Sequence, residues 1–405
     1  MPSKNAYNNT KYTSYLFLFF VLSLLTLPSF FHGFFDFSSF AFGLFFVSLI
    51  FVLVTHKFYF FNFSLAALIF FFVIHLLFSV FFVDLNYKSL ASSVLFLFVV
   101  FSAYVCSHYF FYRRYFLFKF EKAILWIFIL FLFFGLAAVF SGFEFGKFFY
   151  DTSKPVFPFK EPSHYALAFA PLYGFFLLRT KGFISLCVFC VVFLMAFFAQ
   201  SFLLLVVATS LYLLSIANKS LFIPVFFLVM VSVFLLVLSN DYYYERISIG
   251  SSSDNLTALV YLQGVQDAFN SIKNTYGLGL GFQMLGFQEP SYAHYRILEV
   301  MGTDETGAGS NRYDGGFLAA KIIAEFGIFG IIFSFYYLIL MIKSCLFFLK
   351  NNDVEIKKIH PLTIFSLVCI ISFSYEFFIR GMGYFTPGFF LFMFSFFYLK
   401  KARFL

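Results

Sequence analysis

Long apolar runs, separated by brief polar breaks, fill most of the chain. A helix needs roughly 20 apolar residues to cross the hydrocarbon core of a membrane, so the pattern predicts an all-α, polytopic membrane bundle of about twelve transmembrane helices. The expected spans are 12–31, 34–55, 58–83, 89–111, 123–143, 165–178, 183–199, 202–217, 221–239, 317–343, 361–378 and 384–398. Most of the chain is therefore expected to lie in the membrane.

The continuous apolar stretch 183–217 fits either one long helix or two short helices that turn near Gln200 and Ser201. With two helices, 17 of the 27 basic residues fall on one side of the membrane. Basic residues gather on the cytoplasmic side, so two helices are expected, with both termini in the cytoplasm. Lys4 and Lys11 precede the first apolar run without a small-residue cleavage site after it, which predicts a retained first span.

This topology places two polar loops on the opposite, periplasmic side. Residues 1–239 carry the first nine spans and a smaller loop over 142–164, and 317–405 carry the last three spans. The large loop over 240–316 holds four basic and nine acidic residues. Such a long, hydrophilic insert is expected to meet a polar partner outside the hydrocarbon.

One amphipathic helix is predicted inside the large loop. Its apolar positions recur at steps of four and three residues, with Ser252, Ser253 and Asp254 as caps and Gly277 at its end. These positions are Ala258, Leu262, Val265, Phe269, Ile272 and Tyr276. The helix is expected to lie at the membrane interface or to roof the bundle, and packing on the outer surface explains the pattern equally well.

Composition excludes a soluble globule. The 405 residues are 62% hydrophobic and only 11% charged, with a mean hydropathy of +0.92, and no folded core hides that much apolar surface. The net charge of +8 comes from basic residues scattered at the ends of apolar runs. That distribution is typical of membrane orientation and not of nucleic-acid binding.

No motif in the outer segments predicts a metal or another cofactor. The sequence GLGLG at 277–281 follows a helix and lacks the Lys and Ser or Thr of a phosphate-binding loop, so a turn is expected there. The outer segments also lack a DxD pair, an HExxH motif and a Cys/His cluster.

Charged residues gather at the outer ends of the predicted spans. They are Glu161 and His164 before the sixth span, Arg246 after the ninth, Asp314 and Lys321 around the start of the tenth, and Arg380 between the last two. Charges that gather on one side near hydrocarbon usually line a wet cavity, although an interfacial position explains any single arginine equally well. Glu325, within the tenth span, favours a functional or bundle-interior role, whereas His294 and Arg296 favour a solvated one.

The residue types at this cavity suggest a chemistry. Arginine binds phosphate and pyrophosphate through forked hydrogen bonds. A carboxylate with a histidine suits removal of a proton from a hydroxyl.

Several short patches carry a family resemblance. They are EPSH at 161–164, an arginine after the span that leads into the large loop, GLGLG within that loop, DGGFLAAKIIAEFGIFG at 314–330 and FIRGMGYFTPGFF at 378–390. In this order and placement they resemble the Wzy-type O-antigen polymerases, which are related to the O-antigen ligases. The likeness covers most of the chain in topology but only these patches in residues.

The resemblance implies an inverting, metal-independent glycosyltransferase of the bacterial inner membrane. Such an enzyme would move a growing glycan from undecaprenyl pyrophosphate to the non-reducing-end hydroxyl of an incoming lipid-linked repeat unit at the periplasmic face. A flippase and a chain-length regulator in the same membrane would be its partners. The resemblance leaves the catalytic base open among Glu161, His164 and Asp314. The expected pyrophosphate and glycan ligands are Arg246, Arg296, Arg312, Arg380 and Tyr384.

Two departures from the family pattern bear on the alternatives. An arginine followed by ten residues and a glycine is described in two loops of such polymerases, and here Arg296 and Gly307 fit only in the large loop. Ligases carry a loop histidine where this chain reads GSNRYDGG at 309–316, which favours a polymerase over a ligase. A flippase or transporter would carry charges through the depth of the bundle and show related halves.

Overall fold

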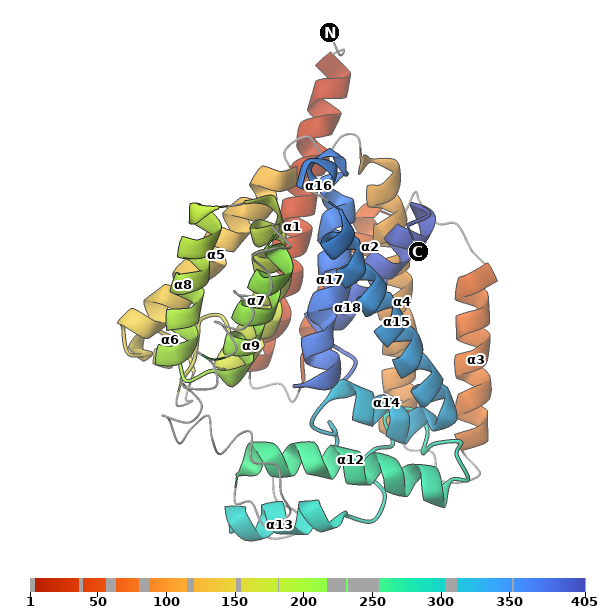
Figure 1. The fold of residues 1–405 in the computed structure, drawn as a ribbon. Helices are drawn as coiled ribbons and strands as arrows, with labels where there is room; N and C mark the ends of the chain where they lie inside the picture. Colours follow the sequence, from red (N-terminus) through yellow and green to blue (C-terminus); the bar gives the residue numbers. More distant parts are fainter. Residues whose placement is uncertain are drawn as a thin grey trace.

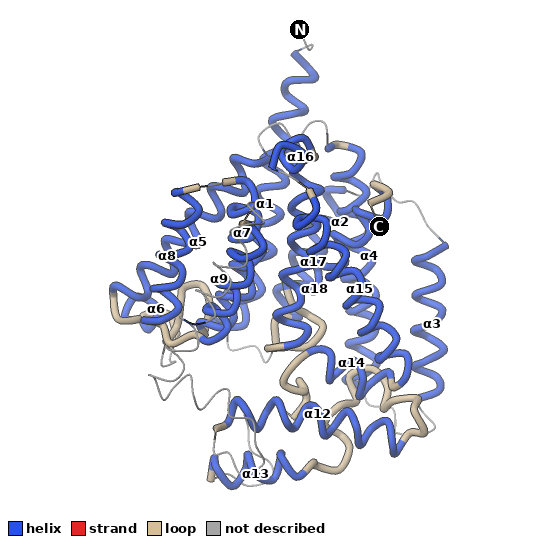
Figure 2. Tube along the Cα trace, viewed as in Figure 1, coloured by secondary structure: helices blue, strands red, loops and turns tan. Residues whose placement is uncertain are grey.

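The computed structural model describes residues 4–35, 39–55, 63–79, 87–114, 120–150, 154–180, 182–216, 231, 255–302, 312–351 and 353–404. Within these ranges the regular structure is helical, apart from one isolated bridge between Val156 and Phe159. The helices are α1 (Lys4–Phe34), α2 (Ala41–Thr55), α3 (Phe63–Ser79), α4 (Tyr87–Tyr112), α5 (Phe120–Phe140), α6 (Glu144–Lys147), α7 (Pro162–Arg179), α8 (Phe183–Phe198), α9 (Phe202–Ser215), α12 (Leu256–Asn274), α13 (Tyr292–Met301), α14 (Leu318–Phe326), α15 (Ile328–Lys350), α16 (Asp353–Lys358), α17 (Pro361–Phe378) and α18 (Pro387–Lys401). Figure 1 shows their arrangement and Figure 2 the loops between them.

The chain is a helical, multi-pass membrane protein. Among the described residues, α1, α4, α5, α15 and α17 are long and apolar enough to cross a membrane, and α2, α3, α8 and α9 are shorter apolar helices. The predicted ninth span, 221–239, lies outside the described residues except for Val231. The count of twelve spans and their orientation therefore stay predictions.

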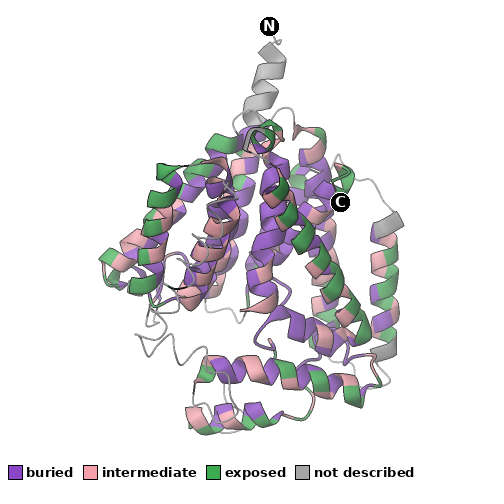
Figure 3. Ribbon diagram, viewed as in Figure 1, coloured by how far each residue is buried: buried purple, intermediate pink, exposed green. Residues whose placement is uncertain are grey.

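The bundle is built around α17 and α18. In α17, 83% of the most apolar window is buried, against 22% in α15, whose outer face carries exposed apolar side chains such as Ile332 and Phe335. The hydroxyl of Tyr337 on α15 donates to the backbone oxygen of Ile370 on α17 at 2.8 Å. Figure 3 shows the buried centre and the more exposed outer helices. Apolar side chains on an outer helix are expected to face lipid.

The predicted helix break at Gln200 and Ser201 is confirmed. The turn is possible because Gln200 adopts a positive φ of 48°. Ser201 then caps α9 by accepting a hydrogen bond from the backbone nitrogen of Leu204. The stretch 183–217 is therefore two short helices, α8 and α9.

The predicted single helix over 317–343 is wrong. The chain breaks at Gly327 (φ 56°), between α14 and α15. The backbone of Gly277 approaches Gly327 so closely that a Cβ there would lie 2.0 Å from the Gly277 oxygen. Ile328 donates its backbone N–H to the same oxygen at 2.8 Å. The GLGLG segment is a turn, as predicted, and it forms backbone hydrogen bonds with the end of α14 and the start of α15.

The predicted amphipathic helix is present as α12. Asn255 caps it by accepting from the backbone nitrogens of Thr257 and Ala258, and the predicted caps at 252–254 lie outside the described residues. Its polar Gln263 and Asp267 are buried, whereas Phe269 is 68% and Tyr276 91% exposed. Two polar residues of α12 therefore face the protein. The predicted apolar stripe is only partly buried, because Ala258 is buried whereas Val265, Phe269 and Tyr276 are exposed.

Candidate active site

A pocket of about 600 Å³ lies where four separate stretches of the chain meet at one end of the bundle. Its walls come from the segment before α7, the turn between α8 and α9, the start of α12 and the residues after α17. The lining residues are Lys154, Lys160, Glu161, Pro162, Ser163, Ala199, Gln200, Ser201, Phe202, Leu203, Thr257, Ile379 and Arg380. The pocket is large enough for part of a small-molecule ligand.

Three polar groups converge on one carboxylate oxygen, Glu161 Oε2. The Ser163 hydroxyl donates to it at 3.0 Å and the Arg380 guanidinium at 3.4 Å. The Nε2 atom of His164 lies 3.7 Å from the same oxygen. The structure thus brings together three predicted site residues, because Arg380 meets Glu161 and His164 although it lies more than 200 residues later in the chain.

Helix ends hold these side chains in place. Glu161 is the extended residue before α7, and Pro162 occupies the first helical position, where proline costs no hydrogen bond. After α17 ends, the backbone nitrogen of Arg380 donates to the oxygen of Tyr375 at 2.9 Å. The following residue, Gly381, donates to the oxygen of Gly316 at 2.9 Å. These contacts fix the backbone from which the Arg380 side chain reaches Glu161.

The pocket favours anions. Three cationic side chains, Lys154, Lys160 and Arg380, line it against one carboxylate, Glu161. The first turns of α7, α9 and α12 also contribute to the wall. A helix N-terminus carries a partial positive charge and is a common place for phosphate to bind. Side chains and helix ends together therefore create a positive potential around a single carboxylate.

Glu161 is ionised at neutral pH. Burial would raise the pKa of its carboxyl, but the neighbouring His164 and Arg380 and the Ser163 hydroxyl outweigh that effect, so the net pKa is lowered. The side chain is 47% exposed. An ionised, half-exposed carboxylate at the wall of a pocket is suited to accept a proton from a bound hydroxyl.

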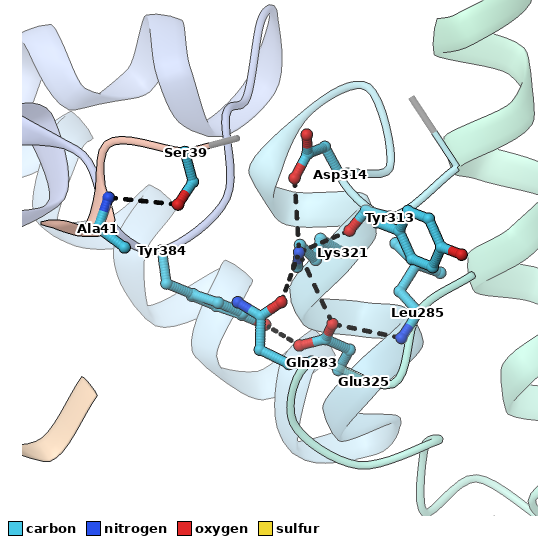
Figure 4. Close-up of polar contacts among 9 residues, drawn as sticks. All are labelled: Ser39, Ala41, Gln283, Leu285, Tyr313, Asp314, Lys321, Glu325 and Tyr384. Carbon is cyan, nitrogen blue, oxygen red and sulfur yellow. Dashed lines mark hydrogen bonds and ion pairs between the residues drawn. The ribbon is translucent and has the colours of Figure 1, made fainter. Parts of the chain in front are cut away.

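Asp314 and Tyr384, also predicted site residues, belong to a separate cluster around the buried Lys321 (Figure 4), in which Asp314 is half-exposed. Lys321 Nζ donates to the Tyr313 backbone oxygen at 2.6 Å and lies 3.7 Å from Asp314 and 3.9 Å from Glu325. Tyr384 donates its hydroxyl to Glu325 at 2.7 Å. Lys321 and Glu325 are 1% and 0% exposed. The bundle-interior role expected for Glu325 is found, and the cluster ties α14 to the segments on either side of it.

Removing Lys321 is expected to destabilise the protein. Lys321→Met leaves Glu325 buried without its cation, and breaking a buried ion pair costs on the order of 3 kcal/mol. Thermal unfolding in detergent should show a lower Tm for this variant and partial recovery in Lys321→Met/Glu325→Gln. Lys88→Met is the control, since Lys88 is exposed and lies over the ring of the same Tyr313. Equal Tm values for all three variants would contradict the assignment.

Two of the remaining predicted arginines, Arg312 and Arg296, are not part of the pocket lining. Arg312 donates to the backbone oxygen of Gln288 at 2.7 Å, which ties two parts of the loop together. Arg296 pairs with Glu299 at 2.6 Å on the exposed side of α13, which fits the solvated role expected for it. His294 is buried beside Gln263 instead of solvated. Arg246 lies outside the described residues.

The interface of α12 and α13 contains a buried carboxyl, Asp267. Burial raises its pKa from 3.8 to about 6, although Ser291, Gln263 and Arg312 partly oppose the shift. Between these two values the folded chain holds more protons than the unfolded chain, so stability falls as the pH rises through that window.

Asp267→Asn is therefore expected to raise the Tm at pH 7.5, where the wild-type carboxyl is ionised in its buried position. At pH 4.5 the wild-type carboxyl is already largely protonated when folded, and the two Tm values should nearly coincide. Thermal unfolding at both pH values in one detergent checks this. The same Tm difference at both pH values would show that charge is not the cause.

Sequence reasoning missed part of the pocket lining. Lys154, Lys160, Gln200, Ser201 and Thr257 are not among the site residues expected from the sequence, although Lys154 donates a hydrogen bond to Gln200 across the pocket. A signal existed, because the predicted topology places 142–164 and the turn at Gln200 on the same side of the membrane. It did not tell which turns on that side touch each other.

The fold and the pocket define a class, a helical multi-pass membrane protein with a cation-rich pocket at one end of its bundle. No protein-family model, curated protein or solved structure matches the chain. Among the described residues, no three His, Cys, Asp or Glu side chains are grouped so that they could hold a metal ion. The functional argument therefore rests on the chemistry of the pocket.

Proposed function

We propose that this protein is an O-antigen polymerase that joins lipid-linked oligosaccharide repeat units at the periplasmic face of the bacterial inner membrane. The observation that carries the proposal is the pocket in which Glu161 meets Arg380, two lysines and three helix N-termini. A glycosyl transfer from undecaprenyl pyrophosphate needs a base for the acceptor and positive charge for the departing pyrophosphate. The pocket supplies both.

In the proposed reaction the acceptor hydroxyl attacks the anomeric carbon of the donor sugar. Its proton passes to Glu161, a new C–O glycosidic bond forms with inversion, and the bond from the anomeric carbon to the pyrophosphate breaks. Undecaprenyl pyrophosphate leaves with the bonding electrons. Arg380, Lys154 and Lys160 stabilise its negative charge together with the helix N-termini, and such preorganised charge is usually a large part of catalysis.

The structure changes which residues the proposal assigns to the pyrophosphate. Arg312 donates to the Gln288 backbone and Arg296 to Glu299, so the proposal assigns the pyrophosphate to Lys154 and Lys160 in place of these arginines. Arg380 keeps its role because it lies both in the pocket and beside the carboxylate. The base is assigned to Glu161, with His164 behind it as a supporting group.

A gene deletion tests the proposal in the cell. The deletion strain should lose the ladder of surface polysaccharide on a gel and keep a single repeat on the lipid A core, and the wild-type gene should restore the ladder. An intact ladder would overturn the proposal. Loss of every repeat from the core would instead indicate a ligase or a flippase, and lipid-linked polymer outside the membrane would then identify the ligase.

The same strain provides a substrate for the direct test. It should accumulate the lipid-linked single repeat, which the purified chain is expected to convert into a series of longer lipid-linked glycans. One undecaprenyl pyrophosphate should be released for each linkage, with EDTA present. Failure of the active, folded chain to lengthen this substrate would reject the polymerase assignment.

A further inference from the structure

A second, small cavity lies behind His164, within the bundle. It measures about 20 Å³ and is lined by residues of α1, α7, α17 and α18, by Phe40 before α2, and by the segment between α17 and α18. Its lining residues are Ser29, Phe40, His164, Leu167, Ala168, Glu376, Met382, Thr386, Pro387 and Gly388. His164 and a second carboxyl, Glu376, therefore line the same cavity.

Among the described residues, the ring nitrogens of His164 are buried without a hydrogen bond. The residue is 6% exposed, and neither ring nitrogen makes a hydrogen bond within the described part of the chain. Its Nε2 atom is the one that lies 3.7 Å from Glu161, so Nδ1, on the other edge of the ring, remains for the side that lines the cavity. A buried nitrogen without a hydrogen bond costs free energy unless a partner is supplied.

Glu376, on α17, also lines this cavity. It is 2% exposed, and the Thr386 hydroxyl donates to its Oε1. Its Oε2 atom lies so close to Gly388 that a Cβ there would be 2.2 Å away, so only glycine leaves room for the carboxyl. No ion pair to Glu376 occurs among the described residues, and a buried carboxylate without a cation is costly. This environment favours the protonated, neutral acid, which is a hydrogen-bond donor.

The cavity fits one water molecule. A buried water needs roughly 10–15 Å³ of such volume and two to four polar partners. His164, Glu376, Thr386 and Ser29 all line a cavity of about 20 Å³. A water there would accept from the Glu376 acid and donate to Nδ1 of His164.

We propose that a single water binds between His164 and Glu376, and that Glu376 acts through it as a positioning residue for the histidine. Because Nδ1 then accepts, the neutral imidazole carries its proton on Nε2 and points it at the Glu161 carboxylate. Arg380 and His32 lie near the same ring, on the pocket side and on α1. The kinetic consequence rests on the proposed function of the pocket, whereas the tautomer of His164 does not.

The tautomer is measured without substrate. In membranes that contain the full chain labelled with ¹⁵N-histidine, His164 should show one neutral form at pH 7, protonated on Nε2, with its signals assigned by their loss in His164→Phe. Glu376→Gln should keep this form, because the amide still donates to the water. Glu376→Leu should produce a mixture of tautomers. A wild-type His164 that is protonated on Nδ1, or a tautomer unchanged in Glu376→Leu, would overturn the inference.

A second variant covers a failure of Glu376→Leu to fold. Ala168→Val fills the cavity from α7 and excludes the water while His164 and Glu376 stay unchanged. It should therefore produce the same mixture of tautomers. An unchanged tautomer in a folded Ala168→Val protein would also overturn the inference.

The kinetic arm uses polymerisation of the lipid-linked repeat. Glu376→Leu should lower kcat about tenfold with KM within a factor of two, and Glu376→Gln should restore most of kcat. Wild-type kcat in Glu376→Leu would contradict the positioning role. If the wild-type chain forms no polymer while the tautomer responds as expected, the proposed function fails and the inference about the water stands.

Discussion

Arg380→Ala is expected to lower the rate of polymerisation by about 10²–10³-fold, the usual loss when one preorganised donor to a developing negative charge is removed. The guanidinium lines the pocket and donates to Glu161 at 3.4 Å, so its removal affects both the pyrophosphate and the base. Arg380→Lys should recover part of the rate, because it keeps the charge but loses the forked geometry. Initial rates on the purified lipid-linked repeat measure the effect.

Arg296→Ala is the matched control. The family resemblance also implies that this arginine binds substrate, but it forms an exposed pair with Glu299 and is not part of the pocket lining. Its loss should leave the rate within about twofold, since exposed ion pairs contribute little. If the two alanine variants lost equal activity, the pocket would not be the site of transfer.

Glu161→Gln is expected to lower kcat by about 10²–10⁴-fold, the range of general-base catalysis. The amide still accepts from Ser163 but cannot take a proton. Because the pKa of Glu161 lies below its ordinary value of 4.5, titration of this group should not reduce the wild-type rate between pH 8 and pH 5. Rates of both proteins over this range, with Tm as a check of folding, measure the effect.

Glu144→Gln provides the control for this substitution. Glu144 pairs with Lys147 at 2.7 Å in the same predicted outer loop and is exposed, but it does not line the pocket. Its rate should equal that of the wild type. If the folded Glu161→Gln protein kept more than a tenth of the wild-type activity, the base would have to be another group.

Helix positions that depend on the hydrophobic pattern could be predicted from the sequence. The stretch from 183 to 217 is resolved correctly into α8 and α9, because the charges on either side of it fix how many times the chain turns there. The run from 317 to 343 is not, because its break at Gly327 depends on the approach of Gly277 from another part of the chain. A contact between distant glycines leaves no trace in local apolar periodicity.

The candidate site shows the same division. Glu161, His164 and Arg380 could be grouped because charges at the ends of neighbouring spans must share the outer surface. Asp314 and Tyr384 are also polar residues near the ends of predicted spans, yet they contact the buried Lys321 and Glu325 in a separate cluster. Which polar residues face a pocket and which satisfy each other is decided by side-chain packing, which the sequence alone does not specify.

The exposed aromatic residues of α12 affect how the large loop behaves when it is isolated. Phe269 and Tyr276 are largely exposed, while the polar Gln263 and Asp267 are turned inward. A fragment over 255–302, made without the transmembrane helices, would expose these apolar side chains to water and is expected to aggregate. Biochemistry on this loop should therefore begin in detergent or nanodiscs, although its composition alone would recommend an aqueous buffer.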